Sequence, residues 1–90
     1  MTSQTTKRFR ELYLRLEPEV QALTRKAYAL WRDNPSHPSL RLKLVNDDPP
    51  VYSVRITRAH RALGVKSDDS MIWYWIGSHD EYEAMIKQMK

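Results

Sequence analysis

The residues best suited to chemistry in this chain are a set of arginines and one histidine between positions 52 and 83. Arg55 lies in the segment YSVRI, Arg58 and Arg61 flank the short connection that follows, and His79 directly precedes an acidic, helix-like stretch. A guanidinium stays charged and offers a planar fork to phosphate oxygens, whereas an imidazole can transfer protons near neutral pH. This combination suits a phosphate-bearing ligand, in particular an RNA backbone.

Further cations come from the segment LRLKLV (40–45), where Arg41 and Lys43 alternate with leucines. Alternation places Arg41, Lys43 and Arg55 on the face of a sheet opposite the apolar residues. Arg61 has the same parity as Leu63 and Val65, so we expect a bend or a strand end to bring it to the cationic face. We therefore predict that Arg41, Lys43 and Arg58 bind RNA.

The histidine allows two interpretations. It can serve as the proton-transfer group of a ribonuclease, which must deprotonate a ribose 2′-hydroxyl and protonate the leaving 5′-oxygen. Alternatively, His79 only hydrogen-bonds a neighbour beside the start of a helix. Asp80 and Glu81 are expected to stabilise that helix start. There is no glycine-rich phosphate loop, HExxH motif or serine elbow, and without cysteine no thiolate zinc site, so we expect neither cofactor nor metal.

Two helices should precede the sheet. Phe9, Leu12, Tyr13 and Leu16 follow the spacing of one helix face, and Glu17-Pro18 interrupts it. Pro18 then suits the first turn of a second helix, which should end near Asp33-Asn34. We expect this helical hairpin to be scaffold.

Four strands and a last helix should follow. The alternating or apolar segments are 40–45, 52–57, about 60–65 and 71–76, separated by turn signals such as NDDPP and KSDDS. Trp73 and Trp75 should share one face as core residues rather than stack on bases. Ser78 and Glu81 have the spacing of a capping box. The expected fold is α+β, with an N-terminal helical hairpin packed on a four-stranded antiparallel sheet and a C-terminal helix, in one domain over residues 1–90.

The composition agrees with a small globular protein. Lysine and arginine number 15 against 11 aspartates and glutamates, for a net charge of +4, which is compatible with an anionic partner. No apolar run approaches the ~18 residues of a membrane span, and the N-terminus lacks the apolar core of a signal peptide. We therefore expect a cytoplasmic protein with no membrane partner.

The ordered motifs LEPEVQ, NPSHPSL, YSVRI, HRALGV and WIGSHDEYE resemble the RelE/ParE superfamily of toxins from type II toxin–antitoxin systems, most closely its RelE/HigB-like members. The resemblance covers nearly the whole chain. It implies a small α+β fold, an antitoxin that blocks the site, and metal-independent cleavage of mRNA on the ribosome that leaves a 2′,3′-cyclic phosphate. ParE-like members instead inhibit DNA gyrase.

By the same resemblance, Arg55 falls where RelE has a catalytic lysine, and Arg61 matches an arginine of the following strand. His79 stands near a basic residue of the C-terminal motif, where other members have a histidine. We therefore predict that Arg55, Arg61 and His79 are catalytic. Ser53 stands where RelE has a lysine, and Tyr82 belongs to a helical stripe and is interpreted as structural. The sequence thus predicts a ribosome-dependent mRNA endonuclease whose partners are a cognate antitoxin and mRNA on the ribosome. The alternatives are a gyrase inhibitor and a non-catalytic binding protein.

Overall fold

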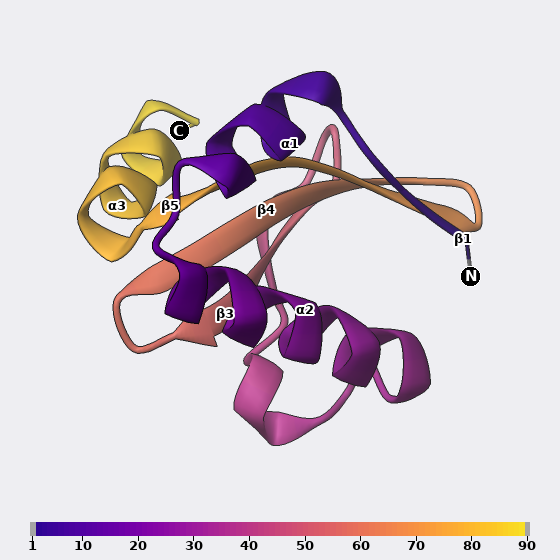
Figure 1. Ribbon diagram of the computed structural model, residues 1–90. Coiled ribbons are helices and arrows are strands. Elements are labelled where there is room, and N and C mark those ends of the chain that lie inside the picture. The colour runs from indigo at the N-terminus through magenta and orange to yellow at the C-terminus, as the bar shows by residue number, and fades with distance from the viewer. Residues whose placement is uncertain (1, 90) are drawn as a thin grey trace.

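The computed structural model describes residues 2–89 as three helices against a five-stranded sheet, an α+β arrangement. Figure 1 shows the long helix α2 crossing the sheet and α3 following directly from the end of β5. In chain order the elements are β1 (Thr2–Thr5), α1 (Lys7–Leu14), α2 (Pro18–Asp33), a 3-10 turn (Pro38–Leu40), β2 (Lys43–Asn46), β3 (Val51–Thr57), β4 (His60–Ser67), β5 (Ser70–Ser78) and α3 (His79–Gln88).

The helical hairpin forms as its sequence predicts. The side chain of Thr6 caps α1 by accepting a hydrogen bond from the Phe9 N–H at 3.1 Å. Pro18 lies in the first turn of α2, where its missing N–H costs nothing, and Glu19 complements the helix dipole there. The helix ends at Asp33, as expected.

The sheet has the order β1-β5-β4-β3-β2. The four strands β2 to β5 are antiparallel to their neighbours, as predicted, but β1 adds a fifth strand that runs parallel to β5. The prediction missed β1 because TSQT is polar and largely exposed, so it lacks the apolar alternation that identifies a strand. Backbone pairing with β5 holds it.

The two faces of the sheet are covered by different helices. The hairpin face carries Val54, Ala62 and Trp73, which form one core with Trp31 of α2. The α3 face carries Leu63 and Trp75, which form a second core with Tyr82 of α3. Burial on both faces therefore explains why β5 reads as a nearly continuous apolar run.

The expectation that Trp73 and Trp75 share a face is wrong. Leu63 pairs with Trp75 but Gly64 pairs with Trp73, so β5 contains one extra residue, Tyr74, at this point. Such a bulge shifts the alternation by one residue and turns the two indoles to opposite faces. Both are core residues, at 4% and 6% exposure, as predicted.

The segment 40–45 is only partly a strand. Leu40 ends the 3-10 turn, Arg41 adopts a left-handed backbone conformation (φ 46°), and β2 begins at Lys43. Among residues 2–89, no helix is long and apolar enough to cross a membrane.

Candidate active site

Arg55 and Arg61 lie directly opposite each other on the α3 face of the sheet. They are register partners in the antiparallel pair of β3 and β4. Like charges at opposed positions destabilise a sheet, so the pair is not explained by folding alone. An anion bound between the two guanidiniums would remove the repulsion.

Arg61 needs no bend to reach this face. The parity with Leu63 and Val65 is correct, but these two residues pack beneath α3 and not beneath the hairpin. The expectation failed because it assigned all apolar strand residues to one covered face. With α3 on the second face, apolar and cationic side chains share it.

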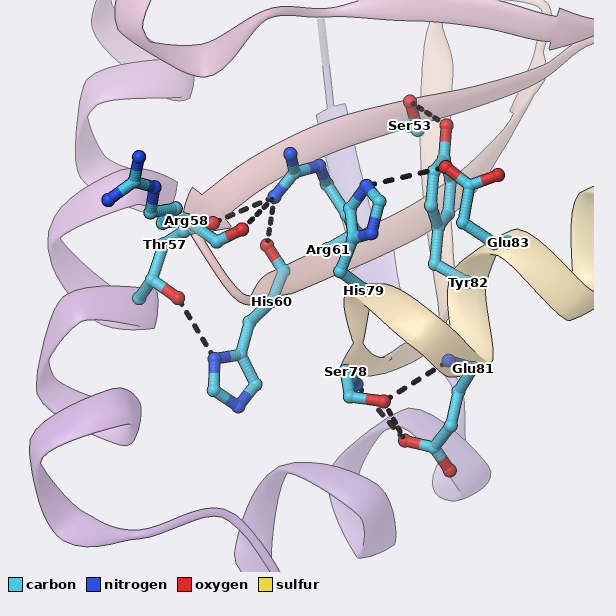
Figure 2. A network of polar contacts seen from close by, with 10 residues as sticks. All are labelled: Ser53, Thr57, Arg58, His60, Arg61, Ser78, His79, Glu81, Tyr82 and Glu83. Carbon is cyan, nitrogen blue, oxygen red and sulfur yellow. Dashed lines mark hydrogen bonds and ion pairs between the residues drawn. The ribbon is translucent and has the colours of Figure 1, made fainter.

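The Arg61 side chain is held by the turn between β3 and β4. Its Nη1 donates to the backbone carbonyls of Thr57 at 2.7 Å, His60 at 2.9 Å and Arg58 at 3.4 Å, as Figure 2 shows. Within residues 2–89 all side-chain hydrogen bonds of Arg61 come from this nitrogen, which leaves Nη2 and Nε to bind a ligand. Such a pre-positioned guanidinium loses little freedom when it binds an oxyanion.

Burial lowers the pKa of Arg61 below its ordinary value, and the positive charges of Arg55 and Arg41 lower it further. Tyr82 and Glu83 act in the opposite direction. The group remains a cation near neutral pH, because a free arginine titrates far above that range. The arginines therefore gather positive charge at a partly buried place, although burial disfavours charge. Such an environment is typical of an anion-binding site.

Arg41 contributes to this cluster from a different element than expected. It follows the 3-10 turn instead of lying within a strand, so the alternation argument for its position is wrong. Its left-handed conformation is uncommon for a residue with a β-carbon and carries a backbone cost. Arg41 is nevertheless among the charges that act on Arg61.

Lys43 lies on the same face, because its register partner on β3 is Ser53. Ser53 is buried at 3% exposure, and its Oγ accepts a hydrogen bond from the Tyr82 hydroxyl at 3.2 Å. Lys43 itself is exposed at the edge strand, next to this pair. Its charge is available to a ligand that extends beyond the arginines.

Arg58 has a different position. It is exposed in the turn, with its guanidinium drawn on the outer side of Arg61 in Figure 2. Its backbone carbonyl helps to hold Arg61, but its charge is not among those that shift the pKa of Arg61. The structure thus gives Arg58 a place beside the cluster rather than within it.

His79 is the first residue of α3, and backbone contacts fix it beside the arginine turn. Its N–H donates to the Ala59 carbonyl at 2.7 Å, which ties the helix start to the connection between β3 and β4. The imidazole Nε2 lies 3.3 Å from Oε1 of Glu83, one helical turn away, and the Tyr82 ring is 5.7 Å from the His79 ring. His79 therefore lies at the same end of the sheet as Arg61.

The predicted capping box is present. Oγ of Ser78 accepts from the Glu81 N–H at 3.1 Å, and the Glu81 carboxylate accepts from the Ser78 N–H at 3.0 Å. These hydrogen bonds lower the pKa of Glu81 below its ordinary value. Glu81 is thus committed to the helix cap, and Glu83 is the carboxylate that faces the site.

Glu83 was not singled out from the sequence. The signal was available, because residues four apart on a helix face each other and His79 and Glu83 have that spacing. Tyr82 packs in the core as expected, and its hydroxyl donates a hydrogen bond to Oγ of Ser53. No three histidine, aspartate or glutamate side chains of residues 2–89 are placed to hold a metal ion.

This arrangement has the parts needed to bind a phosphodiester and move protons around it. Three guanidiniums supply positive charge where negative charge develops, and an imidazole and a carboxylate lie beside them. Lys43 extends the positive surface along the edge strand.

Comparison with protein families finds a match to the ParE-like toxin domain over residues 18–84. That range contains β2 to β5 and all the site residues named above. No curated protein sequence matches the chain.

Several solved structures share the fold. A YoeB/ParE toxin from Agrobacterium tumefaciens superposes with a TM-score of 0.67 at 16% identity, covering 88% of this chain and 99% of that one. A copper-bound mutant toxin from Helicobacter pylori gives 0.63 at 18% identity, with 90% and 97% coverage. The intact RelBE toxin–antitoxin complex of E. coli gives 0.62 at 15% identity, with 84% and 93% coverage.

Proposed function

The chain belongs to the ParE-like toxin domain family, and we propose that it is the toxin of a type II toxin–antitoxin pair that cleaves mRNA on the ribosome without a metal ion. The observation that carries this proposal is the Arg55–Arg61 pair, with Arg41 close by and the His79–Glu83 pair at the same end of the sheet. Opposed arginines suit the binding of a phosphate, and an imidazole and a carboxylate beside them suit proton transfer.

In the proposed reaction the scissile phosphate lies against Arg55 and Arg61. The ribose 2′-oxygen attacks phosphorus, the bond from phosphorus to the 5′-oxygen breaks, and a 2′,3′-cyclic phosphate and a 5′-hydroxyl result. Glu83 accepts the proton from the 2′-hydroxyl, and protonated His79 gives one to the departing 5′-oxygen. The guanidiniums stabilise the extra negative charge on the phosphorane oxygens, which is the main electrostatic contribution in such sites.

Arg41 and Lys43 then bind the flanking RNA backbone, with Arg58 at the outer rim. Contacts of this kind position a strand without reading its sequence. Selectivity for messenger RNA on the ribosome would come from how the codon is presented. The proposed substrate places the protein's action in the cytoplasm.

An antitoxin is the proposed protein partner, since one structure with this fold is a RelBE toxin–antitoxin complex. The antitoxin would neutralise the cationic site directly or cover access to it. An acidic or apolar segment fits that role, because the site combines guanidiniums with the packed edge of α3.

The second candidate function is inhibition of DNA gyrase. It is favoured by the family model, whose description is ParE-like, and by the ParE name of one structural relative. In that case the arginine cluster would be a surface for binding gyrase rather than a catalytic centre.

Induced expression in bacteria with pulse labelling tests the two functions. If the proposal is correct, labelled methionine incorporation stops first, and mRNA is cut within codons. A halt in DNA synthesis with an SOS response supports the gyrase function instead. Equal toxicity of the wild type and the Arg61→Ala and His79→Ala variants, at equal protein levels, contradicts the nuclease.

A further inference from the structure

A cavity of about 400 Å³ lies on the hairpin face of the sheet, opposite the arginine cluster. Val54, Ile56 and Ala62 contribute to it from the sheet, while α1 and α2 line its sides. The volume is within the range of ~300–1,000 Å³ seen for small-molecule sites. The proposed function makes no use of this cavity.

The walls are aromatic and contain unpaired donors. Trp31 of α2 and Trp73 of β5 both line the cavity, and their rings contact each other edge to face with centroids 5.3 Å apart. They are 3% and 4% exposed, and neither indole Nε1 has a hydrogen-bond partner among residues 2–89. Buried donors in folded proteins are nearly always paired, so two unpaired indole donors in the walls of one cavity are unusual.

The mouth carries two guanidiniums that bond only neutral acceptors within the described residues 2–89. Arg10 donates from Nη1 to the carbonyl of Thr5 at 2.7 Å and to its Oγ1 at 3.1 Å. Arg25 donates from Nη1 to the Tyr13 hydroxyl at 2.6 Å. Neither arginine forms an ion pair with a carboxylate in that part of the chain. Both side chains line the cavity.

We propose that this cavity binds a small amphiphilic carboxylate, with its apolar body between the hairpin and the sheet and its carboxylate at Arg10 and Arg25. The aromatic and aliphatic walls select an apolar body. The two arginines select a negative head group, since a guanidinium pairs with a carboxylate through two parallel hydrogen bonds. A monocarboxylate is favoured over a phosphate dianion, because the head group lies at the rim of an apolar cavity and must be partly desolvated.

Three eight-carbon probes test the proposal on the full chain: octanoate, 1-octanol and octylamine. The readout is the indole N–H signal in a ¹H–¹⁵N NMR spectrum, since the chain has three tryptophans and a Trp75→Phe variant assigns the one on the α3 face. Octanoate should shift the signals of Trp31 and Trp73 and leave that of Trp75 in place. Octanol should bind more weakly, and octylamine should not bind.

Variants separate the two parts of the site. Arg10→Gln combined with Arg25→Gln should weaken octanoate binding about tenfold, the loss expected for a charged hydrogen-bond partner, without affecting octanol. Lys26→Gln is the matched control, because Lys26 is a cation of the same helix as Arg25 that does not line the cavity. Ala27→Leu should fill the cavity and abolish binding of both probes while α2 remains helical, since leucine is a good helix former.

Equal affinity for octanoate and octanol would show an apolar cavity without head-group recognition and would overturn the proposal. So would the absence of any shift at Trp31 and Trp73, which would leave the cavity to an apolar side chain of a protein partner. Neither result bears on the nuclease activity, because the cavity and the arginine cluster lie on opposite faces of the sheet.

Discussion

Replacing Arg41 by glycine should make the protein more stable and less active. Arg41 has φ 46° and ψ 46°, a conformation that costs a residue with a β-carbon about 1–2 kcal/mol and costs glycine nothing. Glycine in turn loses about 0.5–1 kcal/mol more backbone entropy on folding. The net gain is roughly 0.5–1 kcal/mol in the free energy of unfolding, or a rise of a few degrees in Tm for a domain of this size.

The same change removes one of the charges that act on Arg61. Loss of one charge-assisted contact to phosphate should slow RNA cleavage about tenfold. It should also lower the salt dependence of RNA binding by about one unit of slope. A stability gain at an exposed arginine, coupled to a loss of activity, is the signature expected if the strained conformation serves the site.

Differential scanning calorimetry and a cleavage assay on the same preparations measure both effects. Arg41→Asn is the first control, because asparagine tolerates the left-handed conformation but carries no charge. Lys26→Gln controls for loss of a charge elsewhere. A Tm below that of the wild type would refute the strain argument, and full activity of both Arg41 variants would refute the role of its charge.

Other predictions concern the helix cap, the sheet and the acid–base pair. The folded-state pKa of Glu81 is lowered, so its contribution to stability is present above pH 4.5 and is lost as the pH falls through the folded-state value. Glu81→Gln should therefore flatten the acid limb of a Tm–pH curve. An unchanged acid limb would contradict this prediction. Gly64→Ala should lower the free energy of unfolding by about 1–3 kcal/mol, because an added β-carbon would lie 2.7 Å from Cε3 of the core residue Trp73. Ser67→Ala, at the exposed end of the same strand, is the control and should change the free energy of urea unfolding by less than about 0.5 kcal/mol. Glu83→Gln should slow cleavage about 100-fold or more if Glu83 accepts the 2′-hydroxyl proton. Asp80→Asn, in the same helix turn, is the control and should cleave at the wild-type rate. Equal rates for wild type and Glu83→Gln would refute the role of Glu83.

The fold could be predicted from the sequence wherever one physical rule acted alone. Pro18 marked the start of α2, Ser78 and Glu81 marked the cap of α3, and apolar alternation marked β3 and β4. β1 was missed because backbone pairing to β5, not side-chain pattern, makes it a strand. The inserted Tyr74 in β5 shifted the alternation, and only the register with β4 reveals it.

The sequence predicted which residues form the site, but not how they lie relative to one another. Arg55, Arg61 and His79 were named, yet their relation depends on the pairing of β3 with β4 and on the contact of His79 with Ala59. The face of Arg61 was misjudged because the sequence does not show which helix covers which side of a sheet. Arg41 reaches the cluster through a backbone conformation that alternation cannot predict.

Cleavage of a defined mRNA on programmed ribosomes tests the central claim most directly. Purified wild-type protein, treated with EDTA beforehand to remove bound metal, should cut the codon in the ribosomal decoding site and leave a 2′,3′-cyclic phosphate. Arg61→Ala should be slower by at least about 100-fold, the loss expected for a group that stabilises the transition state, while Lys26→Ala should match the wild type. No cleavage by folded wild-type protein, or equal rates for wild type and Arg61→Ala, would contradict the account.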